Sequence, residues 1–410
     1  MGRLVDTVKG TVAPGFEPVR EAFVENFRRR REVGAACAVY FRGEKVVDLW
    51  GGLRDPKAGL PWEEDTLVLV FSTTKGISSM ALAVAHTQGL FDYNERVATY
   101  WPEFARGGKA NLTVRQLLSH QAGLCAIDQK MDLALLADPD RVADAIGKQV
   151  PAWRPGEHHG YHGVSLGWYE SELLRRVDPR HRTIGRFFAD EVARPLGLEF
   201  YIGLPRTVDR RRIATIQADH FAARMLLNMH KLPVTFVLGF LKPRSLMNRT
   251  FGNPAVLGQP LRYNDDDMRS IELPASNGIG RVRDIAKAYG TFAIGGGPLG
   301  LKPETLRALE EPARPPAKGL FDLVLRREVS YGLGYCKPSA SFRFGSSNRA
   351  YGTPGAGGSF GFADPDLELG FAYAMNRMDY YLMQDPRETA LSKAAEACAA
   401  RAFGRRRAVA

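Results

Sequence analysis

Ser72 and Lys75 form the only S-x-x-K motif of the chain. The motif lies where a strand-like run, Leu67 to Phe71, gives way to a helical pattern, so Ser72 is expected to begin a helix with Lys75 one turn later on the same face. A helix N-terminus favours negative charge, and a partly desolvated lysine can lose its proton and then accept that of the serine. The motif therefore fits a nucleophilic serine, and a serine N-cap beside a solvated lysine is the alternative interpretation.

A tyrosine supplies a second group of this kind. Tyr161 stands between Pro155-Gly156 and a predicted helix that runs through Trp168 and Leu173. A tyrosine with its usual pKa near 10 is a poor base at neutral pH. A cationic neighbour such as Lys75 would favour the phenolate and make Tyr161 a usable base. Packing against the following helix is the alternative interpretation.

The stretch from Tyr351 to Gly361 is dense in glycine, which lets backbone approach a ligand closely. A backbone N–H from this stretch, paired with that of Ser72, could form an oxyanion hole. Its residues 357–361 also match the G-x-S-x-G motif of α/β-hydrolases, which needs a strand, a turn and then a helix. Strand-like residues follow Ser359, so it is interpreted as a residue other than the nucleophile. A tight turn between two strands is the alternative for the whole stretch.

The histidines do not predict a metal site. His158, His159 and His162 lie close together, but no carboxylate stands at metal-ligand spacing from them on a clear helix face. His120 lies at an apolar helix end and is predicted to be structural. His162 follows Tyr161 directly and is predicted either to tune it or to pack at the surface. We therefore expect no metal and no cofactor.

The net charge of +11 raises the question of nucleic-acid binding. The arginines occur in short clusters at 28–31, 210–212, 326–327 and 405–407, and are not interleaved with aromatic residues along one element. They are interpreted as solvated surface, so no nucleic-acid partner is predicted.

Cysteine use and hydropathy favour a cytoplasmic protein without stable membrane insertion. The four cysteines are widely spaced and form no C-x-x-C pair. Residues 1–15 contain no apolar core of a signal peptide. The longest apolar run, Leu232 to Leu241, is interrupted by Pro233 and Gly239 and is too short to span a bilayer.

These groups must be positioned by elements from distant parts of the chain. Apolar spacing predicts an opening helix over residues 18–30, a hairpin of strands 36–41 and 45–50, and a closing helix over 387–402. Late strands are predicted at 330–335, 341–344, 359–363 and 367–375. The middle of the chain is predicted to be helical, with segments near 76–88, 113–119, 140–148, 163–176, 183–193, 208–230 and 282–292.

This order predicts an α+β fold, with an antiparallel sheet built from both chain ends, terminal helices on one sheet face and an inserted all-helical domain. The expected domains are a discontinuous sheet domain, residues 1–80 and 281–410, and a helical domain, residues 81–280. The apolar stretch 221–241 is interpreted as helical core, as a wall over an acyl pocket, or as a shallow membrane or dimer contact. A candidate apolar lid is placed at 206–275.

The chain resembles the serine β-lactamase and penicillin-binding-protein superfamily. It is most similar to the family-VIII carboxylesterases, which look like class C β-lactamases. The resemblance extends over roughly residues 15 to 400 and implies a β-lactamase/transpeptidase-like fold. It is carried by 47–52 (VDLWGG), 72–75 (STTK), 112–124 (LTVRQLLSHQAGL), Pro155-Gly156 with Tyr161, 331–334 (YGLG), and 355–363 leading into 371–373 (FAY).

The resemblance implies a role for each matching residue. Ser72 would be the acylated nucleophile, Lys75 its proton acceptor or electrostatic partner, and Tyr161 the general base and acid. Which of the two takes the first proton stays open. Thr353-Pro354-Gly355 falls where the β-lactamases have K-T-G, so Ala356 would supply the second oxyanion N–H, with Gly355 and Gly357 beside the substrate.

Two departures from the β-lactamase pattern point to esters. Gly163 replaces the asparagine of the Y-x-N motif, and Thr353 replaces the lysine of K-T-G. Without that lysine, a substrate carboxylate loses a charge-assisted contact worth roughly 1.5–3 kcal/mol, whereas a neutral ester loses nothing. We therefore expect a carboxylesterase for small neutral esters with short-to-medium acyl groups. An acyltransferase using the same acyl-enzyme and a weak β-lactamase or D-amino-acid peptidase are the alternatives, and the oligomeric state is left open.

Overall fold

A computed structural model of the 410-residue chain describes residues 2–218, 228, 231–242 and 244–407. Its centre is a nine-stranded sheet in which every strand pair is antiparallel. The order is β1-β3-β2-β14-β13-β12-β11-β10, with β4 paired to β3. The strands are β1 (Lys9–Val12), β2 (Gly34–Phe41), β3 (Glu44–Asp55), β4 (Leu60–Pro61), β10 (Ser330–Tyr331), β11 (Cys336–Lys337), β12 (Tyr351–Pro354), β13 (Phe360–Asp364) and β14 (Leu369–Met375).

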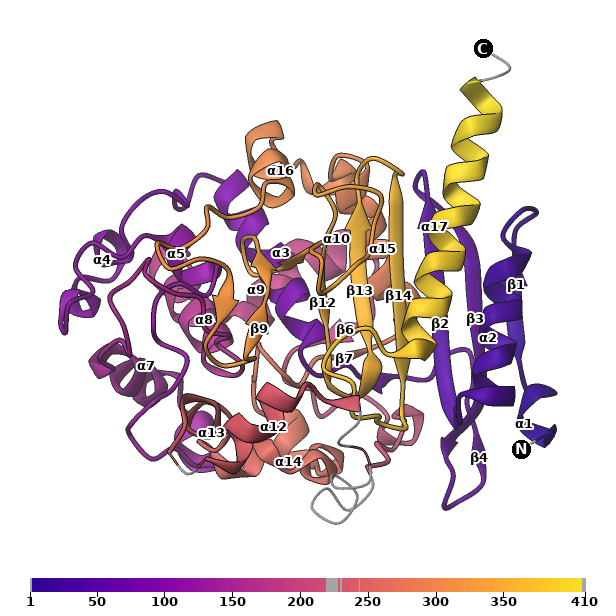
Figure 1. The fold of residues 1–410 in the computed structure, drawn as a ribbon, viewed down its shortest axis with the longest axis horizontal. Helices are drawn as coiled ribbons and strands as arrows, with labels where there is room; N and C mark the ends of the chain where they lie inside the picture. Colours follow the sequence, from indigo (N-terminus) through magenta and orange to yellow (C-terminus); the bar gives the residue numbers. More distant parts are fainter. Residues whose placement is uncertain (1, 219–227, 229–230, 243, 408–410) are drawn as a thin grey trace.

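Both ends of the chain build this sheet, as the sequence predicted. The hairpin of β2 and β3 pairs with β14, where Ala38 lies opposite Ala372. The predicted strands 359–363 and 367–375 correspond to β13 and β14, and 330–335 begins with β10. Figure 1 shows the N-terminal and C-terminal strands side by side in one layer.

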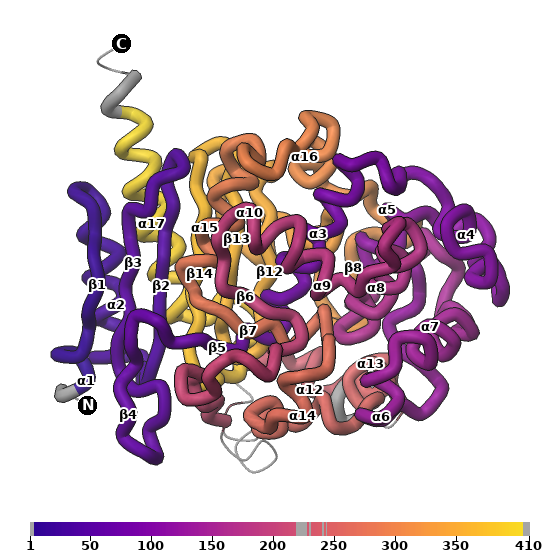
Figure 2. The backbone as a smooth tube through the Cα atoms, turned by 180° about the vertical axis from the view of Figure 1, so that it is seen from behind, coloured from indigo at the N-terminus to yellow at the C-terminus, as the bar shows by residue number. Residues whose placement is uncertain are grey.

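Helices cover the two faces of the sheet. On one face, α2 (Glu17–Arg29) and α17 (Pro386–Arg407) pack on each other and on the sheet, which confirms the predicted terminal helices. Phe23 and Phe27 of α2 share an apolar core there with Phe362, Phe371 and Leu391. The other face is covered by α15 (Val282–Ala293), which packs on β14, β2 and β13 and is seen in front of them in Figure 2.

The helical part of the chain surrounds α3 (Thr73–Thr87), in which every residue except His86 is buried. A small sheet of β5 (Val68–Leu69), β7 (Ile279–Gly280) and β6 (Phe200–Tyr201) fixes the chain just before α3. The middle of the chain further contains α4 (Val97–Tyr100), α5 (Val114–Leu118), α6 (Leu133–Leu136), α7 (Pro139–Lys148), α8 (Ser165–Val177), α9 (Ile184–Phe188), the π-helical turn η2 (Ala189–Ala193), α10 (Arg194–Leu196), α12 (Val234–Leu241), α13 (Leu246–Phe251) and α14 (Asp266–Ser270). A short helix, α16 (Pro303–Glu310), and the pair β8 (Phe321–Asp322) and β9 (Arg327–Glu328) follow later.

Two predicted elements are wrong. Residues 208–230 were expected to be helical, but within residues 208–218 only Arg210–Arg212 forms a 3₁₀ turn. The chain then runs extended, because Ala214 donates its N–H to the Leu67 carbonyl and Gln217 donates to Asn376. The strand expected at 341–344 is a turn in which Ser339 and Phe342 bond each other.

Parts of two predictions lie outside the described residues. In the expected helix 208–230 these are residues 219–227 and 229–230, and in the candidate lid 206–275 they are the same residues and residue 243. The domain boundaries stay predictions. The inserted region is helical in the main and adds β6 to the small sheet. Within the described ranges, no helix is both long and apolar enough to cross a membrane.

Candidate active site

Ser72 occupies the N-cap of α3, yet its hydroxyl does not cap the helix. The preceding Phe71 has φ of +46°, a backbone region that bulky residues adopt only under strain. The Thr74 hydroxyl holds this turn by donating to the Phe71 carbonyl, and the Phe71 ring packs on Tyr263 at 5.3 Å between centroids. The strained turn thus leaves the Ser72 hydroxyl partly exposed and free of backbone contacts.

Lys75 is buried and directed at Ser72. Its Nζ lies 3.0 Å from Ser72 Oγ, 2.6 Å from the Gly163 carbonyl oxygen and 2.9 Å from that of Ala275. Burial lowers the pKa of Lys75 to about 7, while the charge of Glu170 opposes the change. A neutral amine has two N–H bonds, which the two carbonyls accept, so its lone pair is left for the Ser72 hydroxyl proton.

The Ala275 carbonyl is held in place by the turn that follows α14. Asn277 folds this turn by donating to the Met268 and Ile271 carbonyls, and Ser78 of α3 donates to Pro274. This contribution could not be predicted from the sequence, because a carbonyl acceptor leaves no signature in residue type.

Tyr161 lies beside the Ser72–Lys75 pair, with Lys75 Nζ 4.9 Å from its ring centroid. The rings of His120 and Phe251 pack around it at 5.1 and 6.5 Å. Burial raises the pKa of Tyr161 above its usual value, and a hydrogen bond with Ser72 compensates only in part. The expectation that Lys75 would favour the phenolate is therefore wrong, because burial disfavours the charged form of both groups.

A buried carboxylate holds the backbone of Tyr161. Asp322 in β8 accepts the Tyr161 N–H and, at 2.8 Å, the hydroxyl of Tyr331. Its other oxygen accepts the N–H groups of Val324 and Leu325. Asp322 carried no recognisable motif, because its position opposite Tyr161 arises only from the tertiary fold.

The histidines near Tyr161 are structural. The His162 N–H donates to His120 Nδ1 at 3.0 Å, and His162 Nε2 accepts the Leu124 N–H at 3.0 Å. Its other nitrogen contacts the Gly160 carbonyl, so both ring nitrogens are used by backbone, and burial lowers the pKa of His162 to about 3. In the part of the chain that the structure describes, no group of three or more His, Cys, Asp or Glu residues could hold a metal ion.

The glycine turn at residues 355–358 reaches the strand before Ser72. A Cβ on Gly355 would lie 2.3 Å from the Val70 carbonyl oxygen, so only glycine fits this approach. The Ser359 hydroxyl donates to Val70 at 2.8 Å, lies 3.1 Å from Thr73 Oγ1 and is buried. Ser359 therefore fastens the turn, and a strand, β13, follows it.

The turn brings Ala356 next to the start of α3. Among the described residues, the N–H groups of Ser72 and Ala356 have no hydrogen-bond partner, and both stand at the entry of a helical turn. Two such donors on neighbouring backbones can stabilise an oxyanion.

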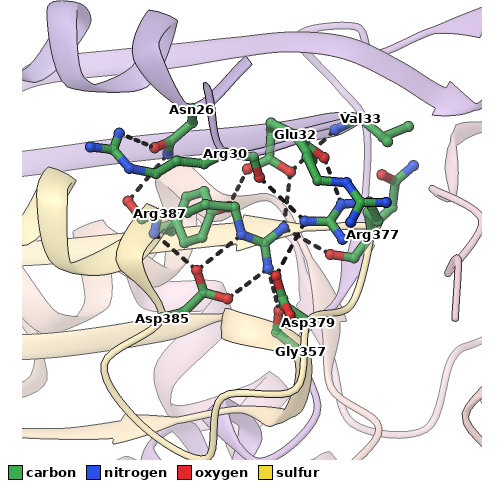
Figure 3. Close-up of polar contacts among 12 residues, drawn as sticks. Asn26, Arg30, Glu32, Val33, Gly357, Arg377, Asp379, Asp385 and Arg387 are labelled. Carbon is green, nitrogen blue, oxygen red and sulfur yellow. Dashed lines mark hydrogen bonds and ion pairs between the residues drawn. The ribbon is translucent and has the colours of Figure 1, made fainter. Parts of the chain in front are cut away.

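Arg387, in the first turn of α17, holds the same glycine turn through the Gly357 carbonyl (Figure 3). Its guanidinium donates to the Gly357 carbonyl at 2.7 Å and to Asp385, and it pairs with Glu32 at 3.3 Å. The Asp379 N–H also donates to Gly357. This buried network joins the two terminal segments of the chain to the turn that carries Ala356.

Thr353 and Gly163, the two departures from the β-lactamase pattern, do not offer polar groups to a substrate. Thr353 is buried and faces α3, where a Cβ on Gly76 would lie 3.0 Å from Thr353 Oγ1. A Cβ on Gly163 would lie 2.6 Å from the Phe251 ring. An apolar ring thus occupies the space that a side chain at 163 would need.

Glu170 of α8 is a buried carboxyl group that sequence analysis did not single out. Ser79 donates to its Oε1 at 3.2 Å, and its Oε2 has no partner among the described residues. Because Ser79 follows Lys75 by four residues, Glu170 contacts α3 one turn beyond Lys75. Burial raises the pKa of Glu170 to about 8, and the two groups attract each other when both are charged.

Replacing Glu170 with glutamine should move the pH dependence of catalysis. In the wild type, kcat/KM should rise with pH as Lys75 becomes neutral, over two linked proton losses centred near pH 7. Glu170→Gln removes the carboxyl group whose charge favours the Lys75 ammonium, so the rise should move to lower pH.

Glu172→Gln is the matched control, because Glu172 lies on the same helix but pairs with Arg175 and Arg176. Ester hydrolysis measured from pH 5 to 9 distinguishes the two variants. An unchanged profile in Glu170→Gln would contradict the assigned coupling.

Residues 19–395 match the family described as Beta-lactamase. The chain is 32% identical over 375 residues to Esterase/beta-lactamase LipL of Mycobacterium tuberculosis, covering 90% of this chain and 83% of the relative. A solved family VIII carboxylesterase has a TM-score of 0.83 and 36% identity over 95% of this chain and 99% of its own. A penicillin-binding protein homologue from Caulobacter crescentus also has a TM-score of 0.83, with 33% identity over 95% of this chain and 99% of its own.

Proposed function

This chain belongs to the beta-lactamase family and is a serine hydrolase, and we propose that it is a carboxylesterase that cleaves neutral esters through an acyl-enzyme on Ser72. The position of Lys75 carries the proposal, because its two carbonyl partners leave the amine lone pair for the Ser72 hydroxyl. Esterase names among the relatives support the reaction class.

In the proposed acylation, Lys75 removes the proton of Ser72 while Oγ attacks the ester carbonyl carbon. The N–H groups of Ser72 and Ala356 stabilise the negative charge on the carbonyl oxygen. The tetrahedral intermediate then expels the alcohol, which takes the phenol proton of Tyr161, and the Lys75 ammonium returns a proton to the phenolate. The acyl-enzyme and a free alcohol result, with both bases again neutral.

In the proposed deacylation, a water molecule attacks the acyl carbon and Lys75 takes the water proton. Ser72 Oγ leaves and recovers a proton through Tyr161, which releases the acid. Tyr161 thus serves as a proton donor to departing oxygens, in keeping with its raised pKa. Asp322 and Arg387 are positioning residues, since each holds the backbone of a reacting segment.

Esters are favoured over β-lactams by the surroundings of the site. The name of the mycobacterial relative includes both activities. In this chain the threonine at the K-T-G position is turned toward α3, and the Phe251 ring fills the space at Gly163. A carboxylate-bearing substrate would therefore miss two polar contacts, whereas a short-to-medium neutral acyl chain would meet apolar rings. The predicted cytoplasmic location is kept in this proposal and is compatible with four buried, free cysteines.

We expect kcat/KM for nitrocefin to be about 10- to 150-fold below that for p-nitrophenyl butyrate, given the lost charge-assisted contact of roughly 1.5–3 kcal/mol. A series of p-nitrophenyl esters from acetyl to dodecanoyl should show its maximum at short-to-medium chains. Both substrates are measured on the same preparation, with Ser72→Ala as the blank for contaminating enzymes. Efficient nitrocefin turnover with a low micromolar KM would contradict the preference for neutral esters.

A further inference from the structure

The surface of α12 exposes apolar side chains that no described element covers. Val234 is 73% exposed and Leu238 62%, and their spacing of four residues puts them on one side of the helix. Phe321, which is 38% exposed, lies near α12. The Arg326 guanidinium stacks on the Phe321 ring at 5.3 Å, and the Arg326 carbonyl accepts the hydroxyl of Thr235 in α12. Val234, Leu238 and Phe321 are called the apolar ridge below.

The ridge is held on an anchored helix. Val237 is buried, Phe236 packs against the core of the sheet domain, and Gly239 lies against Met247 of α13. The opposite side of α12 is therefore already used by the fold. The exposure of the ridge is a property of the folded protein.

The segment that contains α12 is positively charged, whereas the exposed Glu328 lies opposite Phe321 in the β8–β9 pair, and Arg262 pairs with Asp265 and Asp267. Residues 220–264 contain no aspartate or glutamate and six arginines and lysines. Lys231 and Arg249 pair with Asp379 and Asp128, which lie outside this segment. Lys242 and Arg244, just after α12, are exposed and form no ion pair with any described residue, and the same holds for Arg326 beside Phe321. Exposed apolar side chains bordered by unpaired cations match the chemistry of an anionic lipid surface.

The ridge is also connected to the site. Phe251 of α13 packs on Tyr161 and faces Gly163, while Met247 of the same helix contacts Gly239 of α12. Figure 1 shows α12 and α13 together at the same side of the molecule. Met247 and Phe251, both on α13, therefore lie between α12 and the Tyr161 ring.

We propose that α12 and Phe321 dock on an anionic phospholipid surface, with Val234, Leu238 and Phe321 among the acyl chains and Lys242, Arg244 and Arg326 at the headgroups. Docking there brings the site to esters that partition into the lipid. The contact is shallow and reversible, because the ridge is short and its helix stays packed on the protein. It goes beyond the proposed function and does not depend on ester hydrolysis.

Binding is tested with the full chain and sucrose-loaded vesicles of phosphatidylcholine alone or with 30% phosphatidylserine, by co-sedimentation at 0.1 and 0.5 M NaCl. We expect the wild type to bind the anionic vesicles at 0.1 M salt. Binding should fall by about tenfold or more at 0.5 M salt or on pure phosphatidylcholine. The same loss of binding is expected for the double variants Val234→Ser/Leu238→Ser and Lys242→Glu/Arg244→Glu. Val150→Ser, which changes a residue 58% exposed elsewhere, should bind like the wild type.

Three results would overturn the proposal: no binding of the wild type to anionic vesicles, binding unaffected by both double substitutions, or a concentration-dependent dimer that Val234→Ser/Leu238→Ser abolishes. The last result would assign the ridge to a second copy of the chain. Vesicle binding is also measured with Ser72→Ala, which lacks the proposed nucleophile. Binding by this variant tests docking independently of whether the esterase proposal is correct. Hydrolysis of soluble p-nitrophenyl acetate should be unchanged in the ridge variants, which shows that they fold.

Discussion

Ser72→Ala should lower ester hydrolysis by at least about 10⁴-fold, because no acyl-enzyme can form without the hydroxyl. Ser359→Ala should retain most activity, although Ser359 lies in a G-x-S-x-G motif. The Ser359 hydroxyl is buried and donates to Val70, and its loss should cost about 1 kcal/mol of folding stability. The two variants therefore separate the nucleophile from a serine that fastens the glycine turn.

The measurement is intact-protein mass spectrometry after reaction with a fluorophosphonate, followed by peptide mapping. One adduct on Ser72 is expected in the wild type and in Ser359→Ala, and none in Ser72→Ala. An adduct on another residue, or full activity in Ser72→Ala, would refute the mechanism. Thermal unfolding of each variant shows whether a loss of activity reflects chemistry or folding.

Lys75→Met should lower kcat/KM by about 10³-fold, since Ser72 would lose the group that accepts its proton. The chain offers a matched control in Lys337, a second buried lysine whose pKa burial lowers to about 7. Lys337 Nζ donates to the carbonyls of Leu309, Glu310 and Arg349, whereas Lys75 has two carbonyls and a serine hydroxyl. Burial and polar satisfaction are thus similar, and only one of the two lysines faces a reacting atom.

Lys337→Met should reduce the unfolding temperature and leave the rate per active site close to that of the wild type. Activity is normalised to active sites by the burst of p-nitrophenol released in acylation. The wild type and Lys337→Met should show kcat/KM rising with pH near 7, because the Lys75 ammonium loses its proton there and becomes a base. If Lys75→Met kept that rise, the base would have to be another group.

The sequence was informative where residue type and order carry the chemistry. The S-x-x-K motif, Tyr161 and the glycine turn predicted segments that the fold brings together, and β-rich runs predicted the strands β2, β3, β13 and β14. Ser72 at the N-cap and Lys75 one turn later follow from helix geometry alone, so their proximity needs no tertiary information.

What the sequence could not supply depends on burial and backbone atoms. The sequence predicted a phenolate at Tyr161 from its lysine neighbour, but burial of Tyr161 raises its pKa and that of Lys75 lowers its own. Asp322 and Glu170 act on Tyr161 and Lys75 across more than 90 residues of chain, a separation that no local pattern reveals. Arg387 looked like part of a closing helix, and its role depends on a single carbonyl, that of Gly357.

The placement of the last strands and of Arg387 sets the time at which this protein can first react during its synthesis. Ser72 and Lys75 leave the ribosome first, and the glycine turn, β14 and Arg387 follow roughly 15–60 s later at about 5–20 residues per second. Until then β2 presents an open edge where β14 will pair, which exposes the nascent chain to aggregation. In the proposed mechanism, a ribosome-bound chain that has not yet reached Arg387 therefore holds Ser72 without the second oxyanion donor, and hydrolysis begins only after the glycine turn and Arg387 have emerged.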